Sequence, residues 1–141
     1  MTEEILNIYT DGGSRGNPGP SAIGVVIGNK EYGEYIGKTT NNVAEYKAVI
    51  FALKKVKHLL GKEKLKHTKV VIHLDSELVA NQLNGKYKIL EPELQPLFIE
   101  IWNLRFNFPN LIFQHVPREN NVRADKLVNE VLDNNNQKPL L

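Results

Sequence analysis

The spacing of apolar residues changes near residue 41, and this change constrains the fold more than any other feature of the chain. Before it, two short apolar stretches, at residues 5–10 and 22–28, and an alternating stretch at residues 31–40 are separated by segments that contain Gly, Pro or Asn. Such stretches predict β-strands. Because they follow one another closely along the chain, we expect them to form an antiparallel meander.

After residue 41 the apolar side chains recur at spacings of three and four, which predicts an amphipathic helix. Its apolar face carries Tyr46, Val49, Ile50, Leu53, Val56 and Leu60. We expect Asn41 or Asn42 to cap the N-terminus, since a short polar side chain there satisfies free backbone N–H groups. Gly61 marks the expected end of the helix.

The rest of the chain continues as strands joined by helices. It predicts two strands, at residues 69–75 and 111–116, and three helices, at residues 76–85, 92–107 and 120–134. Right-handed crossovers would make both later strands parallel to the first. The expected fold class is therefore α/β, with a five-stranded mixed sheet of three antiparallel and two parallel strands, flanked by helices.

The composition fits one domain over residues 1–141, with a flexible tail at residues 134–141. The absence of cysteine excludes disulfides, thiolate zinc sites and a cysteine nucleophile. A net charge of +2 permits a polyanionic partner without requiring one. No apolar run is long enough for a membrane helix, and the acidic start is unlike a signal peptide, so we expect a cytoplasmic protein.

Two of the expected strands end in the same way. The segments LNIYTD and VVIHLD are both apolar and terminate at Asp11 and Asp75. If the two strands are adjacent and parallel, these carboxylates lie side by side at the carboxyl edge of the sheet, where α/β proteins form ligand crevices. The alternative is that each Asp only begins a turn or caps a helix.

Glu45 and Asp125 lie near the starts of two expected helices, on the faces that should meet the sheet. The neighbours on these faces are Val49, Ala52 and Val56 for Glu45, and Val122, Val128 and Leu132 for Asp125. The helix dipole favours a carboxylate in the first turn, so a structural role is the alternative. An unpaired carboxylate on an apolar face is nevertheless costly.

Four gathered carboxylates need a counter-charge, because like charges at close range raise one another's pKa and destabilise the fold. Two divalent cations would balance the four charges, and hard oxygen ligands favour Mg²⁺ or Mn²⁺. Two such ions about 4 Å apart promote phosphoryl transfer, one by generating hydroxide and the other by stabilising the leaving oxygen. The residues therefore predict a two-metal site.

Four segments resemble, in order, the motifs of the type 1 ribonuclease H family. They are YTDGGSRGNPGPSAIGVVI, TTNNVAEYKAVIFAL, HLDSELVANQL and HVPRENNVRADKLVN, and the similarity extends over about residues 5–133. The resemblance implies a ribonuclease H-like fold and metal-dependent hydrolysis of the RNA strand in an RNA–DNA hybrid. We expect a monomer that acts on the hybrid without a membrane or a protein partner.

The resemblance also implies roles for individual residues. The family's catalytic and metal-binding carboxylates fall on Asp11, Glu45, Asp75 and Asp125, and its substrate-binding positions on Asn17, Thr40, Asn41 and Asn42. Gly12 and Gly13 are further substrate-binding candidates. Asn side chains suit a minor groove whose 2′-hydroxyls mark the RNA strand, and glycines allow the backbone to approach it. Thr40 and the nearby helix start suit a DNA phosphate. Helix capping is the competing explanation for Asn41 or Asn42.

The sequence departs from many bacterial family members in two places. Residues 116–125 are short and lack the family's His-containing loop, so we interpret His115 as a strand residue. Arg118 is a candidate for contact with the scissile phosphate, with a solvated surface arginine as the alternative. Residues 84–94 replace the basic handle helix and carry two lysines, which predicts weaker phosphate binding.

Two other functions remain open at this point. A nuclease of the same fold could act on double-stranded RNA or another nucleic acid, and an inactive relative could serve only as a binding module. Four intact carboxylates count against the binding module, because without cations they would repel a polyanion.

Overall fold

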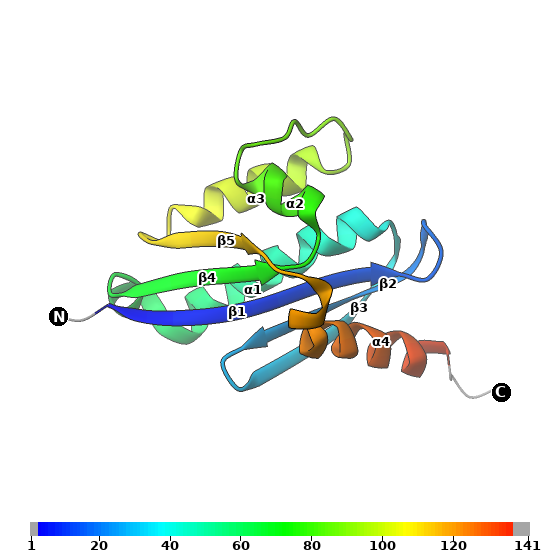
Figure 1. Cartoon of the computed structure of the whole chain (residues 1–141), viewed down its shortest axis with the longest axis horizontal. Coiled ribbons are helices and arrows are strands. Elements are labelled where there is room, and N and C mark those ends of the chain that lie inside the picture. The colour runs from blue at the N-terminus through cyan, green and yellow to red at the C-terminus, as the bar shows by residue number, and fades with distance from the viewer. Residues whose placement is uncertain (1–2, 137–141) are drawn as a thin grey trace.

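The computed structural model describes residues 3–136, which form a five-stranded sheet with helices on both faces (Figure 1). The strands are β1 (Glu4–Ser14), β2 (Gly19–Ile27), β3 (Lys30–Thr39), β4 (Thr68–Leu74) and β5 (Leu111–His115). The helices are α1 (Asn41–Leu65), α2 (Glu77–Leu83), α3 (Gln95–Arg105) and α4 (Val122–Asn136), with a short 3₁₀ helix, η1 (Arg118–Asn120). The predicted α/β class is confirmed.

The strand order in the sheet is β3-β2-β1-β4-β5. The first three strands form the expected antiparallel meander, and β4 and β5 run parallel to β1. The predicted mixed sheet is therefore confirmed. Strand β1 is central, between an antiparallel and a parallel neighbour, so the residues at its carboxyl end are within reach of several elements.

The main core lies between the sheet and α1. Leu53 of α1 is fully buried there together with Ile8 of β1 and Ile72 of β4. On the opposite face, α4 covers β2 and β3 (Figure 1) and buries Val128 and Leu132 in a smaller apolar cluster. The two helices that carry Glu45 and Asp125 therefore approach the sheet from opposite faces.

Strand β1 extends beyond its predicted end at residue 10. It continues through the glycine-rich segment to Ser14, because Gly12 pairs with Ile23 and Gly13 with Ala22 of β2. The sequence favoured a loop here because glycine is common in turns. Pairing with β2 overrides that local preference, and the connection between the strands shortens to residues 15–18.

Helix boundaries also differ from the prediction. Helix α1 continues past Gly61, whose φ of +77° marks a kink, and ends at Leu65. Helix α3 begins at Gln95 rather than at residue 92, and Pro96 occupies its first turn, where the missing N–H costs no helix bond. Helix α4 includes residues 134–136, which were expected in the flexible tail. Residues 137–141 of that tail lie outside the described residues.

The capping residue of α1 was predicted wrongly. Thr40, and not Asn41 or Asn42, is the N-cap, and its Oγ1 accepts a hydrogen bond from the Val43 backbone N–H at 3.2 Å. Strand β3 ends at Thr39 and leaves Thr40 with an extended backbone, which is the conformation that an N-cap requires.

Candidate active site

Two carboxylates lie at the carboxyl edge of the sheet, on neighbouring parallel strands. Asp11 follows Thr10 of β1, and Asp75 follows Leu74 of β4, while Thr10 and Leu74 are register partners. Asp11 is buried and Asp75 is half-buried. The identical endings of the two apolar strands therefore place two acidic side chains together.

Glu45 reaches the same point from α1. The helix packs so closely on β1 that a Cβ on Gly12 would overlap the backbone of Ala44 and lie 2.5 Å from the Glu45 nitrogen. The backbone N–H of Gly12 donates to Oε1 of Glu45 at 3.3 Å, and Oε2 of Glu45 is buried without a hydrogen-bond partner among the described residues. A buried carboxylate oxygen without a partner is costly unless another ligand occupies it.

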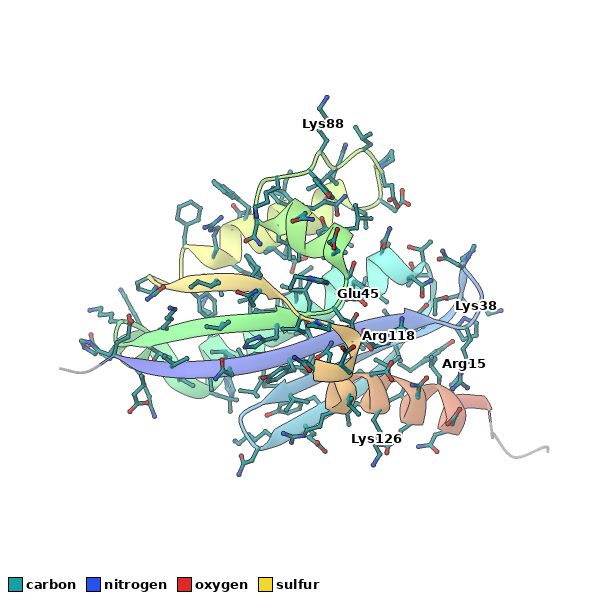
Figure 2. All side chains as sticks on the ribbon, viewed as in Figure 1. Arg15, Lys38, Glu45, Lys88, Arg118 and Lys126 are labelled. Carbon is teal, nitrogen blue, oxygen red and sulfur yellow. The ribbon has the colours of Figure 1, made fainter. Side chains whose placement is uncertain are left out.

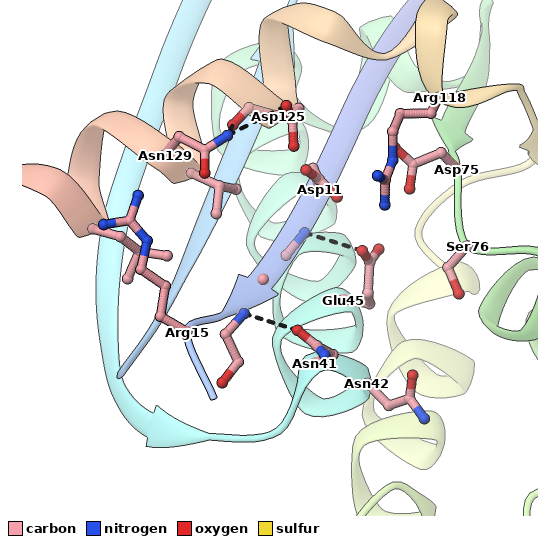
Figure 3. Close-up of a pocket in the computed structure, with 15 residues that line it drawn as sticks. Asp11, Arg15, Asn41, Asn42, Glu45, Asp75, Ser76, Arg118, Asp125 and Asn129 are labelled. Atoms are coloured by element: carbon pink, nitrogen blue, oxygen red, sulfur yellow. Dashed lines mark hydrogen bonds between the residues drawn. The ribbon is translucent and has the colours of Figure 1, made fainter. Parts of the chain in front are cut away.

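Carboxylate oxygens of Asp11, Glu45 and Asp75 lie within 4.8 Å of one another. Asp125 lies on α4, outside this group of three, and its charge still acts on Asp11. The Asn129 amide, one turn further along α4, donates to Oδ2 of Asp125 at 3.3 Å. Figure 3 shows the three clustered carboxylates facing the same space, with Asp125 on the α4 side.

Burial is the main reason that the pKa of Asp11 is raised from its ordinary 3.8 to about 7. A hydrogen bond with Glu45 lowers this pKa in part, while the charges of Asp75 and Asp125 raise it. Burial raises the pKa of Glu45 well above its ordinary value, and the charge of Asp11 adds to that effect. The cluster therefore retains protons unless a positive charge enters it.

The donor set fits a divalent cation of the hard class. It consists of carboxylate oxygens, and one of them, Oε2 of Glu45, is buried and unpartnered. The absence of cysteine leaves no thiolate in the chain, so the oxygen ligands favour Mg²⁺ or Mn²⁺ over a softer ion. Asp11, Glu45 and Asp75 would hold such an ion.

The carboxylates line an open cleft of about 410 Å³ (Figure 3). The cleft also includes Gly12, Gly13, Ser14, Arg15, Asn41, Asn42, Ser76, Arg118, Val128, Asn129 and Leu132. Its walls therefore come from strand ends, from the first turns of α1, from η1 and from α4. Most of its exposed surface is polar, which suits a charged, hydrated ligand.

The predicted substrate-binding residues divide into two groups. Gly12, Gly13, Asn41, Asn42 and Arg118 line the cleft with side-chain or backbone atoms. The Asn42 amide donates to Oε1 of Glu91 at 3.2 Å, so part of its hydrogen-bonding capacity is already used. Arg118 is exposed on η1, and its guanidinium lies on the Asp75 side of the cleft (Figure 3).

Three of the predicted substrate contacts have clear structural roles. Gly12 lines the cleft but is buried, and its N–H donates to Oε1 of Glu45, so its predicted contact with the substrate stays a prediction. Thr40 caps α1 and does not line the cleft. Asn17 also lies outside the lining residues, and its Oδ1 accepts from the Asn41 N–H at 3.0 Å. Oδ1 of Asn41 in turn accepts from the Ser14 N–H at 2.9 Å.

Sequence reasoning missed several polar residues at this site. Ser76 and Arg15 line the cleft, as does Asn129, whose position four residues after Asp125 is a signal that could have identified it. Asn121, four residues before Asp125, is buried and donates to Oδ2 of Asp75 at 3.2 Å. His115 lies exposed at the end of β5 and does not line the cleft, as expected of a strand residue.

A comparison with known protein families identifies the family to which this fold and site belong. The reverse transcriptase-like family model matches residues 9–131. The chain belongs to this family, among the type 1 ribonucleases H.

Solved and curated relatives agree with this assignment. LC11-RNase H1, isolated from compost by a metagenomic approach, is 48% identical, with a TM-score of 0.87 over 96% of this chain and 99% of that one. LC11-RNase H1 in complex with an RNA/DNA hybrid gives 49% identity and a TM-score of 0.86, over 92% and 98% of the two chains. Ribonuclease HI of the archaeon Halobacterium salinarum is 38% identical over 91% of this chain.

Some curated relatives are longer than this chain. The bifunctional protein Rv2228c of Mycobacterium tuberculosis is 36% identical over 89% of this chain, but only 35% of the mycobacterial protein is covered. The chain likewise covers 64% of the Halobacterium ribonuclease HI. The similarity therefore concerns one region of each of these proteins.

Proposed function

We propose that this protein is a metal-dependent endoribonuclease that hydrolyses the RNA strand of RNA–DNA hybrids. The observation that carries the proposal is the group of Asp11, Glu45 and Asp75, whose oxygens lie within 4.8 Å of one another at the carboxyl edge of the sheet. A cluster of buried acidic side chains with raised pKa values weakens the fold when it is empty, which points to a role in function.

The proposed cofactor is Mg²⁺, with Mn²⁺ as a substitute, and two ions in all. The four carboxylates of Asp11, Glu45, Asp75 and Asp125 carry enough charge to balance two divalent cations. Such cations activate water and stabilise the leaving oxygen in phosphodiester hydrolysis. The chain's own contribution is rigid placement: two carboxylates are fixed by strand ends and two by helices from opposite faces of the sheet.

The proposed substrate is supported by the cleft and by a relative. LC11-RNase H1, 49% identical, was crystallised in complex with an RNA/DNA hybrid. Amide groups of Asn41 and Asn42 border the cleft and can bond to 2′-hydroxyls. Figure 2 shows Arg15, Lys38, Lys88 and Arg118 on separate segments of the chain, and such cations can contact phosphates, although Arg15 is already paired with Asp133.

Location and assembly are the remaining parts of the proposal. Among the helices of residues 3–136, none is long and apolar enough to cross a membrane. Action in the cytoplasm and a monomeric state stay predictions.

The proposal is tested by incubating the protein with end-labelled RNA–DNA hybrid, double-stranded RNA and double-stranded DNA, with Mg²⁺, with Mn²⁺ and with a chelator. We expect cleavage of the RNA strand of the hybrid alone, only when a divalent cation is present. Cleavage of double-stranded RNA at a comparable rate would support the alternative substrate. An absence of hybrid cleavage across both cation titrations would contradict the proposal.

A further inference from the structure

Asn121 is a buried polar residue directly before α4, with only 1% of its surface exposed. Its side chain amide donates to the Thr10 backbone oxygen at 2.9 Å and to Oδ2 of Asp75 at 3.2 Å. Its own backbone oxygen accepts from the Asp125 N–H at 3.1 Å. One residue therefore bonds to the strand that carries Asp11, to the Asp75 carboxylate, and to the first turn of the helix that carries Asp125.

The orientation of the Asn121 amide follows from its partners. A backbone oxygen only accepts hydrogen bonds, so the Nδ2 group must face Thr10, and the same group donates to Oδ2 of Asp75. Oδ1 of Asn121 is then left buried without a partner among the described residues. A buried amide oxygen without a partner lowers stability, which is a reason to look for a function that retains the residue.

A neutral donor has a particular advantage at this position. A lysine or arginine could also hold Asp75, but its charge would compete with a cation for the carboxylates. Aspartate would add a further negative charge and remove the N–H groups. An amide fixes the orientation of Asp75 and leaves the charge of the cluster unchanged.

We propose that Asn121 is a positioning residue, whose amide orients the Asp75 carboxylate relative to Asp11 and Asp125 so that the cluster can bind divalent cations. The expected effect of Asn121 on catalysis rests on the proposed function. The expected effect on cation binding can be measured without a substrate. Groups that orient metal ligands typically change metal affinity or activity by about 10- to 100-fold when removed.

The test replaces Asn121 by Ala and, separately, by Leu, whose side chain branches at the same position, is somewhat larger, and so leaves no cavity. Asn84→Ala is the matched control, because the Asn84 amide donates to the Phe113 backbone oxygen at 3.0 Å, away from the carboxylates. For each protein we would measure Mn²⁺ binding by calorimetry without substrate, the Tm of the metal-free protein, and kcat and KM on the hybrid.

We expect both Asn121 variants to bind Mn²⁺ at least about tenfold more weakly and to lose kcat by about 10- to 100-fold, with KM for the hybrid changed little. Asn84→Ala should lower the Tm but retain the wild-type Mn²⁺ affinity. If the folded Asn121→Leu protein binds Mn²⁺ within twofold of wild type, the positioning role is refuted. If wild type binds Mn²⁺ but cleaves no hybrid, the proposed function fails, while the calorimetric comparison still decides the role of Asn121.

Discussion

The backbone N–H of Gly12 donates to Oε1 of Glu45 at 3.3 Å, and this bond joins the strand that carries Asp11 to the helix that carries Glu45. The contact is possible because a residue without a Cβ lies where α1 crosses β1, against Ala44. The proximity of the two acidic side chains is therefore set by backbone packing, which holds them together even though their charges repel.

Gly12→Ala is expected to destabilise the protein, because the added Cβ would overlap the Ala44 backbone, which cannot move without shifting α1. Overpacking costs about 1–3 kcal/mol or more, so the Tm should fall by several degrees. Gly13→Ala is the control, since its Cβ would meet only the Val128 Cγ1 atom, at 3.2 Å. Equal melting temperatures for the two variants, measured by calorimetry, would argue against close packing of α1 on β1.

Asp11→Asn should abolish cleavage of the hybrid while the metal-free protein keeps or gains stability. The substitution removes a proposed cation ligand and one negative charge from a buried acidic cluster. Cleavage assays and thermal melts in the presence of a chelator measure the two effects separately. A marked fall in the Tm of this variant would instead mean that Asp11 is needed for folding.

The stability of the metal-free protein should fall as the pH rises from about 4 to about 7. The pKa of Asp11 is 3.8 in the unfolded chain and about 7 in the folded one, so in this window the folded state binds more protons. The stabilisation is complete below pH 3.8 and is lost as the pH passes 7, a change of a few kcal/mol. In the Asp11→Asn protein, the free energy of unfolding should change less with pH over this range. An unchanged dependence on pH would contradict the raised pKa of Asp11.

Mg²⁺ should raise the Tm of the wild-type protein in a dose-dependent manner, because it binds the folded cluster and not the unfolded chain. At a Mg²⁺ concentration 100 times its Kd, the free energy of unfolding rises by about 2.7 kcal/mol. Glu45→Gln, which keeps an acceptor for the Gly12 N–H but removes the charge, should show a smaller gain. A flat titration of the wild type would mean that the carboxylates do not form a cation site.

Arg118→Ala is expected to lower kcat/KM on the hybrid by roughly 10- to 100-fold, the value of a lost hydrogen bond to a charged group. Arg118 is exposed beside Asp75, so the Tm should change little. The control is His115→Ala, since His115 is exposed on β5 and does not line the cleft. A loss of 100-fold in the His115 variant would identify it as a general acid or base instead.

The sequence could predict the element order and the positions of the acidic side chains, because both follow from periodicity. The apolar runs that precede Asp11 and Asp75 lie on neighbouring parallel strands, which brings the two residues together, and Glu45 follows from the face of its helix. The capping role of Thr40 and the burial of Gly12 depend on where β3 ends and how β1 pairs. Local residue preferences do not contain that information.

The role of Asn121 could not be predicted from the sequence, because it depends on contacts between residues far apart in the chain. Its amide contacts the Thr10 oxygen 111 positions earlier in the chain, and only the folded structure brings the two together. As the second of two adjacent asparagines before a helix, it has the sequence signature of an ordinary cap.

The four carboxylates lie far apart in the sequence, so they are synthesised at different times. Asp11 and Thr10 are made early, whereas Asn121 and Asp125 belong to the last segment that the structure describes. A growing polypeptide on the ribosome therefore holds three of the four carboxylates proposed to bind cations long before the fourth, Asp125, is available. The proposed nuclease would remain inactive until α4 has emerged and docked, so translation order itself delays RNA cleavage until the fold is finished.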